Sequence, residues 1–500
     1  MMTLFFAALS GLALSIILER MMRPRPRFLR PLASWSLHIG IWLLVYGLLA
    51  LVLGRPWFSM TVTTVLFLIL VQVNNAKMHS LREPFVYQDY EYFTDAIRHP
   101  RLYIPFFGWG KFFIAVAGGA IAIGIGLWGE PLPPDRWSLN GYLGTVLILT
   151  SLALVLVAGG HYSMRHLSID PVNDLIRLGF VASLWAYSMA SRQKPDSSLG
   201  PFNAMPSVVA ATSLPHMLVV QSESFFDPRP LFDGIRKDIL ASFDSVKKSS
   251  LLHGKLNVPA WGANTVRSEF SFLTGIDEKS LGVHRFNPYR AISAGWHVSS
   301  IASYLKQLGY RTICIHPYPG SFYSRDIVYP LLGFDEFLDI SVFDGVALTG
   351  PYIGDIDVAT KISELLSVST QPIFIYAITM ENHGPLHLED ASEVDTSTIY
   401  DILPPEGTDD LTVYLRHLRN ADRMISQLTN ELKELSRPSG LCWFGDHVPI
   451  MPEVYEIMGF PSGEVDYLVW YSEEHGTSTE RSFKANQLAT EFLKVMRLMT

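Results

Sequence analysis

Five titratable side chains stand at the ends of short apolar runs in the later part of the sequence. In chain order they are Glu223, His316, His383, Asp446 and His447. Carboxylate oxygens combined with imidazole nitrogens suit a hard-to-borderline divalent cation such as Mn²⁺, Mg²⁺ or Zn²⁺. Each residue alone has an ordinary explanation, as a turn carboxylate, a helix cap or a buried histidine. Their repetition at four run ends favours a shared metal site.

A hydroxyl residue stands near the start of the segment WGANTVRSEFSFLTG, residues 261–275. Thr265 precedes a stretch of helical character. A helix N-terminus offers free backbone N–H groups and the positive end of the dipole, which stabilise a phosphate. Two interpretations stay open: Thr265 caps a helix, or a nearby metal lowers the pKa of its hydroxyl and makes it a nucleophile.

The elements that must position these residues alternate between strands and helices. Apolar runs of strand length occupy 216–221, 310–316, 372–379, 441–444 and 465–471. Segments of helical periodicity occupy 297–308, 354–366, 411–435 and 482–498. Strands that are apolar on both faces and alternate with helices predict a parallel sheet covered on both sides. Sites in such α/β sheets lie beyond the C-terminal ends of the strands, where these side chains are expected.

The first third of the chain has a different composition. Apolar residues make up 49% of the sequence and the mean hydropathy is +0.22. Nearly uncharged apolar runs occupy 3–19, 35–53, 57–73, 110–128 and 142–160. Each approaches the roughly 20 residues that cross a bilayer as a helix. No small-residue cleavage site follows the first run, so we predict a membrane domain rather than a signal peptide.

A length of 500 residues favours two or more structural units. We expect a transmembrane domain, a juxtamembrane segment and a catalytic α/β domain at 1–165, 166–213 and 214–500. Within the middle segment, Val172 to Met189 is interpreted as one amphipathic interfacial helix, because Asp174 and Arg177 would be costly in hydrocarbon. Residues 191–213, rich in Ser, Pro and Gly, are interpreted as a linker.

Charge and cysteine content exclude several classes of protein. A net charge of −8 without a basic stripe argues against nucleic-acid binding. Two cysteines in the whole chain exclude a disulfide scaffold and a cysteine-based zinc site. Cys314 and Cys442 fall inside predicted strands, where free cysteine usually behaves as a small buried apolar residue.

The order of Glu223, Thr265 and the Asp446–His447 pair resembles the phosphoglycerol transferase and lipoteichoic acid synthase family. The stretches HPYPGSFYSRDIVYPLLGFDEFLD and TMENHGPL carry the same resemblance, which covers about 216–455. That family belongs to the alkaline phosphatase and sulfatase superfamily. The resemblance implies an N-terminal α-helical membrane domain of about five transmembrane helices. An α/β alkaline-phosphatase/sulfatase-like domain with a mainly parallel central sheet is implied to follow it.

The resemblance also implies roles for individual residues. A single metal ion, usually manganese, is expected to be held by Glu223, Thr265, Asp446 and His447, with Thr265 as the catalytic nucleophile. The expected substrate-binding residues are His316, Tyr323, Arg325 and His383. Tyr323 stands where lipoteichoic acid synthases have tryptophan, which keeps an aromatic wall. Whether His316 and His383 bind the donor phosphate or transfer protons stays open.

The function implied is transfer of glycerol phosphate from a phospholipid, phosphatidylglycerol, to a glycan acceptor through a phospho-threonine intermediate. A periplasmic glucan or a surface polysaccharide is the expected acceptor. Three alternatives remain: a phosphoethanolamine transferase, a hydrolase releasing glycerol phosphate, and a non-catalytic membrane protein that binds anionic glycans or lipids. A true sulfatase is disfavoured because Cys314-Ile315-His316-Pro317 lacks the CxPxR spacing of formylglycine sites.

Loop charges and the resemblance disagree about topology. Two loops of the membrane domain are basic, one with Arg20, Arg23, Arg25, Arg27 and Arg30, the other with Lys77, Arg82, Arg98, Arg101 and Lys111. The positive-inside tendency, with five spans, would place the catalytic domain in the cytoplasm. The resemblance implies a catalytic domain outside the bacterial cytoplasmic (inner) membrane. We expect the second arrangement, because the motif match is more specific than a charge bias.

Overall fold

The structure is a computed structural model that describes residues 2–91, 93, 109–132, 136–164, 167–205, 214–473 and 477–499. The chain divides into two compact units, Met1–Gln193 and Lys194–Thr500. We call the first the helical unit and the second the sheet unit. Residues 206–213 of the predicted linker, together with Arg98 and Arg101 of the basic loop, lie outside the described residues. The three-part division expected from the sequence stays a prediction.

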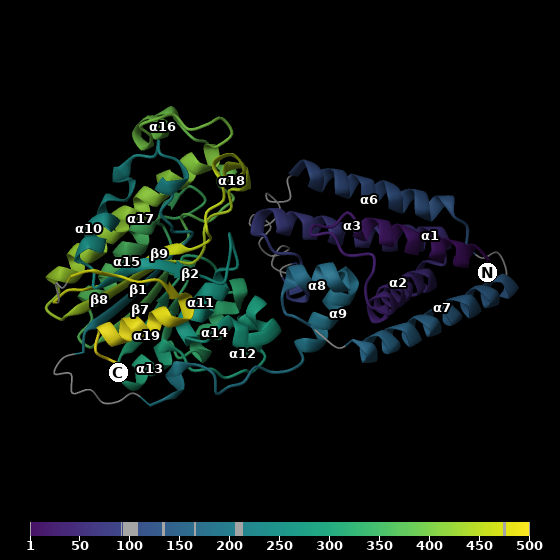
Figure 1. Cartoon of the computed structure of the whole chain (residues 1–500), viewed down its shortest axis with the longest axis horizontal. Helices are drawn as coiled ribbons and strands as arrows, with labels where there is room; N and C mark the ends of the chain where they lie inside the picture. Colours follow the sequence, from purple (N-terminus) through teal and green to yellow (C-terminus); the bar gives the residue numbers. More distant parts are fainter. Residues whose placement is uncertain are drawn as a thin grey trace. The chain divides into compact units, whose positions relative to one another are not determined.

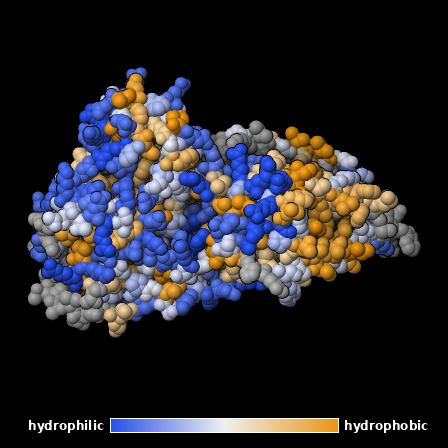
Figure 2. Space-filling model, viewed as in Figure 1, coloured by the Kyte–Doolittle hydropathy of each residue, from blue (hydrophilic) through white to orange (hydrophobic). Residues whose placement is uncertain are grey.

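Long apolar helices build the helical unit. They are α1 (Met2–Glu19), α2 (Leu32–Leu53), α3 (Pro56–Leu81), α6 (Trp109–Gly129) and α7 (Arg136–Ser163). Within the described residues, α1, α2, α3 and most of α7 are long and apolar enough to cross a membrane, while Ala117–Gly129 of α6 forms a shorter apolar helix. Hydrophobic side chains gather on the visible surface of these helices (Figure 2), and Leu48, Leu147 and Ile148 are exposed. The prediction of a multi-span membrane domain is confirmed.

The segment interpreted as one amphipathic helix is two helices, so that prediction is wrong. α8 (Pro171–Leu178) and α9 (Phe180–Ala190) are separated at Gly179, whose φ of 81° is a conformation that side chains disfavour. Asp174 is fully buried rather than interfacial. Its carboxylate accepts hydrogen bonds from the Ser168 backbone N–H and the Tyr187 hydroxyl, which offset the cost of burial. A glycine in an otherwise helical pattern was the local indication of this break.

The sheet unit is built on one large mixed sheet with the strand order β10-β2-β9-β8-β1-β7-β3-β4, and β11 pairs with β2. The main strands are β1 (His216–Ser222), β2 (Leu252–Asn257), β3 (Arg311–Ile315), β4 (Glu336–Leu338), β7 (Ile373–Ile378), β8 (Ser439–Gly445) and β9 (Val465–Tyr471). Short edge strands are β10 (Thr479–Glu480) and β11 (Phe483–Lys484), and β5 (Leu348–Thr349) pairs with β6 (Tyr352–Ile353) apart from the sheet. The five predicted strands correspond to β1, β3, β7, β8 and β9.

Strands β8, β1, β7, β3 and β4 are mutually parallel, whereas β9 runs antiparallel to β8 and β2 antiparallel to β9. The prediction of a mainly parallel central sheet is confirmed. Every residue of β1, β7 and β8 is buried, including Cys442, because helices cover both faces. Strand β2 was missed because its sequence, LHGKLN, lacks the continuous apolar run of the other strands and is interrupted by a glycine.

Two helical layers cover the sheet, as Figure 1 shows. One layer contains α10 (Ala241–Ser249), α15 (Asp355–Ser367) and α17 (Asp409–Glu434); the other contains α11 (Thr265–Thr274), α13 (Ile301–Gln307) and α19 (Ala485–Val495). Shorter helices lie nearer the strand ends: α12 (Pro288–Ser293), α14 (Arg325–Leu331), α16 (Glu393–Ile399) and α18 (Pro452–Met458). The leucines that recur at three- and four-residue intervals in α17 are buried, which accounts for its length.

Parallel register aligns the strand ends that carry the candidate site. Ser222 of β1 lies opposite Gly445 of β8, so Glu223 and Asp446 leave the sheet side by side. On the other side of β1, Gln221 lies opposite Ile378 of β7. The C-terminal ends of these strands therefore meet at one edge of the sheet, as the sequence predicted.

Gly445 is required at this edge because nothing larger fits. A Cβ atom at this position would lie 1.9 Å from the Phe225 carbonyl oxygen, which is backbone. We predict that Gly445→Ala lowers the free energy of unfolding by about 3 kcal/mol, measured by thermal or denaturant unfolding. Gly440→Ala in the same strand is the matched control. Its Cβ would meet the Met496 side chain, which is able to move. Equal losses in the two variants would contradict the prediction.

Candidate active site

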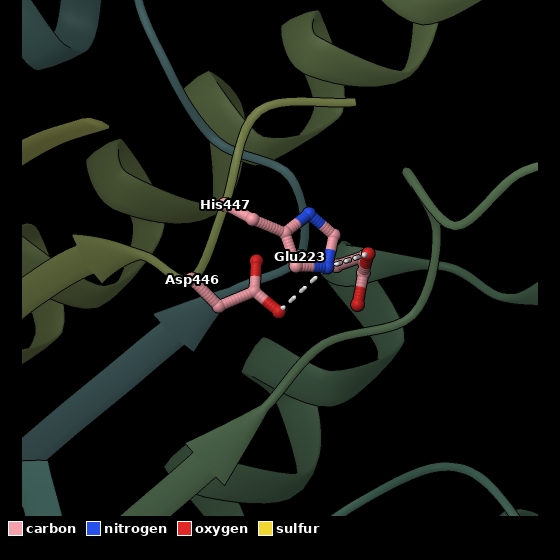
Figure 3. Close-up of side chains that lie close together, drawn as sticks. All are labelled: Glu223, Asp446 and His447. Atoms are coloured by element: carbon pink, nitrogen blue, oxygen red, sulfur yellow. Dashed lines mark ion pairs between the residues drawn. The ribbon is translucent and has the colours of Figure 1, made fainter. Parts of the chain in front are cut away.

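Three buried residues form a candidate metal centre at the end of β1 and β8. Glu223, Asp446 and His447 each offer one ligand atom, and these atoms all lie within 4.8 Å of one another. His447 Nε2 lies 3.6 Å from Glu223 Oε1 and 3.4 Å from Asp446 Oδ2 (Figure 3). The fold therefore brings together residues more than 200 positions apart, and we call this set the metal triad.

The donor set and charge of the metal triad fit a divalent cation. Among the described residues, Asp446 Oδ2 is buried and has no hydrogen-bond partner, while Asp446 Oδ1 accepts a hydrogen bond from the Ser224 backbone N–H. Burial and, next, the like charge of Asp446 raise the pKa of the Glu223 carboxyl to about 8. Both effects show buried negative charge without sufficient compensation. Two carboxylates and one imidazole suit Mn²⁺, Mg²⁺ or Zn²⁺.

Thr265 is the first residue of α11, and its hydroxyl faces the metal triad. Its Oγ1 lies 3.5 Å from His447 Nε2. Asn264, not Thr265, occupies the cap position, so the interpretation of Thr265 as a helix cap is wrong. Ser268 on the next turn donates a 2.6 Å hydrogen bond to the Asp446 carbonyl and thereby ties α11 to the end of β8. The start of α11 presents the positive end of its helix dipole next to Thr265, which favours an anion there.

The predicted substrate-binding residues line one pocket together with Thr265 and with Glu223 of the metal triad. Its lining consists of Glu223, Ala263, Asn264, Thr265, His316, Phe322, Tyr323, Arg325, Met380 and His383. They come from the ends of β1, β3 and β7 and from the starts of α11 and α14. All four residues expected to bind substrate therefore lie within reach of a single ligand.

The two pocket histidines are held neutral. Burial and, next, the charge of Arg325 hold the pKa of His316 well below its usual range. His316 Nε2 accepts from Arg325 Nη1 at 3.1 Å. Burial also lowers the pKa of His383, whose Nδ1 lies 2.6 Å from the Gly384 carbonyl oxygen. A carbonyl oxygen only accepts hydrogen bonds, so Nδ1 of neutral His383 carries the proton and donates it to Gly384. The other ring nitrogen, Nε2, is then an acceptor.

Strained backbone conformations cluster around the pocket. Ser224, Asn264, Tyr323 and Ser324 are non-glycine residues with φ between 52° and 65°. The left-handed region is unfavourable for residues with a side chain and persists only where the surroundings enforce it. These residues directly adjoin Glu223, Thr265 and Arg325, so the loops that carry the site are fixed in unusual conformations by the packing around them.

Sequence reasoning missed Glu269 and the two tyrosines that contact it. Glu269 lies on α11, is fully buried and pairs with Arg325; Tyr289 and Tyr329 donate to the same carboxylate. The available indication was spacing, because Glu269 is four residues after Thr265 and so lies on the same face of the helix.

This combination of fold and site defines a class of membrane-anchored sulfatase-fold proteins, and the comparisons agree. The family model described as Sulfatase matches residues 215–498, more than half of the chain, and the chain belongs to this family. The predicted membership of the alkaline phosphatase and sulfatase superfamily is confirmed.

Individual relatives show how far the likeness extends. The capsular polysaccharide biosynthesis protein RkpI of Rhizobium meliloti is 26% identical over 451 residues, covering 83% of this chain and 77% of that protein. Lipoteichoic acid synthase 1 of Bacillus subtilis is 33% identical over 147 residues, 28% of this chain and 21% of that protein. The integral membrane lipooligosaccharide phosphoethanolamine transferase A of Neisseria meningitidis has a similar fold across both units, with a TM-score of 0.55, 14% identity and coverage of 97% and 95%.

Binding of Mn²⁺ to the metal triad should stabilise the full-length protein, and more so as the pH rises. The Glu223 carboxyl, with its pKa raised to about 8, keeps a proton at lower pH that the cation must displace. Without a cation, the same raised pKa supplies stability at low pH that is lost as the pH rises through about 8. At 100 times the Kd that applies at about pH 8.5, Mn²⁺ should add about 2.7 kcal/mol at that pH and less at the same concentration at about pH 6.5, measured by thermal unfolding.

Asp446→Asn should remove most of this stabilisation, whereas Asp238→Asn, at an exposed acid of the same unit, should leave it intact. Equal Mn²⁺-induced shifts in the two variants would place the cation elsewhere.

Proposed function

We propose that the protein is a membrane-bound, metal-dependent phosphoglycerol transferase. It moves glycerol phosphate from a phospholipid, phosphatidylglycerol, to a glycan acceptor through a phospho-threonine intermediate. The observation that carries this proposal is the position of Thr265. Thr265 is the first residue of α11, its hydroxyl lies 3.5 Å from His447 Nε2, and it lines one pocket with Glu223 and Arg325.

The chain's own residues account for both steps of a double displacement. In the first, Thr265 Oγ1 attacks phosphorus and loses its proton, the Oγ1–P bond forms, the bond to the diacylglycerol oxygen breaks, and that oxygen takes up a proton. In the second, an acceptor hydroxyl attacks phosphorus, the Oγ1–P bond breaks and Thr265 regains its proton. A divalent cation held by Glu223, Asp446 and His447 would supply Lewis acidity and lower the pKa of the attacking hydroxyl. The positive N-terminal end of α11 and the Arg325 guanidinium stabilise the phosphate oxygens.

The pocket favours a glycerol head group over an ethanolamine one. Among the described residues that line it, the carboxylate is Glu223, which belongs to the metal triad. The aromatic rings of Phe322 and Tyr323 have the Arg325 guanidinium 5.9 and 5.2 Å from their centroids. The ammonium group of ethanolamine would therefore compete with the Arg325 guanidinium for the aromatic rings. The hydroxyls of glycerol are able to donate a hydrogen bond to His383 Nε2.

A membrane-spanning helical unit is consistent with a lipid donor. The likeness to a protein named for capsular polysaccharide biosynthesis, over 83% of this chain, supports a glycan acceptor, either a periplasmic glucan or a surface polysaccharide. We place the protein in the bacterial cytoplasmic (inner) membrane with its sheet unit outside the cytoplasm, where such glycans are found.

Thr265→Ala should abolish transfer because no oxygen remains to form the intermediate. Activity with phosphatidylglycerol labelled in its head group should fall by a factor on the order of 10³ or more, whereas Thr265→Ser should keep a measurable fraction. The assay follows label into a periplasmic glucan in the presence of Mn²⁺. A transfer rate in Thr265→Ala equal to that of the wild type would contradict the phospho-threonine mechanism. Equal release of free glycerol phosphate with and without glucan would identify a hydrolase, and preferential use of phosphatidylethanolamine would identify a phosphoethanolamine transferase.

A reporter fusion tests the topology. An alkaline phosphatase fused after Thr500 should be active, because it requires export to fold. A fusion at Gly54, between α2 and α3, should be inactive if five helices span the membrane and the sheet unit is outside. Activity of a cytoplasmic reporter alone at Thr500 would reverse the assignment and support the loop-charge rule instead.

A further inference from the structure

A buried hydrogen-bond network contacts the pocket residue Arg325 and contains no member of the metal triad. Its centre is Glu269, which is fully buried on α11. The Tyr289 hydroxyl donates to its Oε1 at 2.5 Å, and the Tyr329 hydroxyl donates to the same oxygen. Arg325 donates through Nε to Oε1 at 3.2 Å and through Nη2 to Oε2 at 2.8 Å. Four donors from α12 and α14 thus meet one carboxylate.

This arrangement fixes the plane and position of the Arg325 guanidinium. A two-point Arg–carboxylate pair sets orientation as well as distance, which a single ion pair does not. On its other side Arg325 Nη1 donates to His316 Nε2 at 3.1 Å. Three of its five N–H groups are therefore committed to protein partners, and the remaining ones are available to a ligand in the pocket that Arg325 lines.

The same helix sets the positions of both reacting partners. Thr265 is the first residue of α11, and Glu269 lies one turn further along it. Any shift of α11 moves the nucleophile and, through Glu269, the guanidinium that would hold the phosphate. Because one helix positions both Thr265 and Arg325, the distance between the attacking oxygen and the bound phosphorus is kept constant. Misplacement of about 1 Å at such a site costs on the order of 10²-fold in rate.

We propose that Glu269, which does not line the pocket, is the positioning residue of Arg325, and that it holds the guanidinium in place for the phosphate of the donor. This inference rests on the proposed function for the identity of the donor. The rival explanation is that Glu269 only stabilises the core. The two differ in whether the effect of changing Glu269 passes through Arg325.

A double-mutant cycle separates the two explanations. Glu269→Gln keeps the size of the side chain but loses its charge and one acceptor oxygen. We expect it to lower kcat for phosphoglycerol transfer by about 10²-fold, with the Mn²⁺-induced thermal shift unchanged, since Glu269 is not in the metal triad. Arg325→Lys should be similarly impaired, and the double variant should be no worse than Arg325→Lys alone. Losses that multiply, or a diminished Mn²⁺ shift, would overturn the proposal.

Glu389→Gln is the matched control. Glu389 also pairs with an arginine, Arg416, at 2.7 Å in the same unit and does not line the pocket, so activity should stay near wild type. If Glu269→Gln does not fold, Glu269→Asp replaces it in the cycle. That variant keeps the charge but is one methylene too short to reach both Arg325 nitrogens, and the same non-additivity is expected.

An equilibrium measurement makes the test independent of turnover. Binding of glycerol 1-phosphate to the Mn²⁺-loaded full chain, followed by calorimetry, should weaken about 10-fold in Glu269→Gln, equivalent to the loss of one charge-assisted contact. It should weaken no further in the double variant than in Arg325→Lys. One outcome is that the affinities of the wild type and the variants follow this pattern while the wild type transfers nothing from phosphatidylglycerol. In that case the proposed function fails and the positioning role stands. Absence of binding to the wild type would overturn the positioning role.

Discussion

Parallel pairing between β1 and β8 sets the positions on which the site depends. The register that places Ser222 opposite Gly445 sends Glu223 and Asp446 out of the sheet as neighbours. Their burial concentrates negative charge that the surrounding hydrogen bonds compensate only in part. A bound cation offsets the free-energy cost of burying these two carboxylates most directly. The strand pairing and the electrostatics of the site therefore both favour a metal centre. The close approach of Gly445 to the Phe225 backbone explains why the strand ends on glycine.

Helix α11 performs the second organising role. It starts at Thr265, contacts the end of β8 through Ser268 and holds Arg325 through Glu269. A buried charge pair of this kind contributes little net stability unless its remaining hydrogen-bonding capacity is satisfied. Here the two tyrosine hydroxyls satisfy the carboxylate, and His316 accepts from the guanidinium. The network therefore accounts for a fixed arginine better than it accounts for overall stability.

The helical unit follows a different physical rule. Its outward side chains are apolar because the solvent for these helices is lipid, and its polar groups are satisfied internally, as at Asp174. A lipid donor and a glycan acceptor differ greatly in solubility. A chain that joins a membrane domain to a pocket lined by Thr265 and Arg325 suits the reaction that we propose between them.

The sequence by itself determined the α/β class and the apolar helices, and it marked Glu223, Asp446 and His447 among the five polar side chains that follow strands. These features depend on local patterns: buried runs of strand length, uncharged runs of membrane length, and polar residues directly after strands. Only the tertiary structure decided the antiparallel placement of β9 between β8 and β2, the break at Gly179 and the contacts of Glu269. Glu269 and Arg325 are 56 residues apart, and their contact exists only because α11 and α14 pack at the same end of the sheet. Periodicity records which face of an element is buried, but it does not record which distant side chain that face will meet.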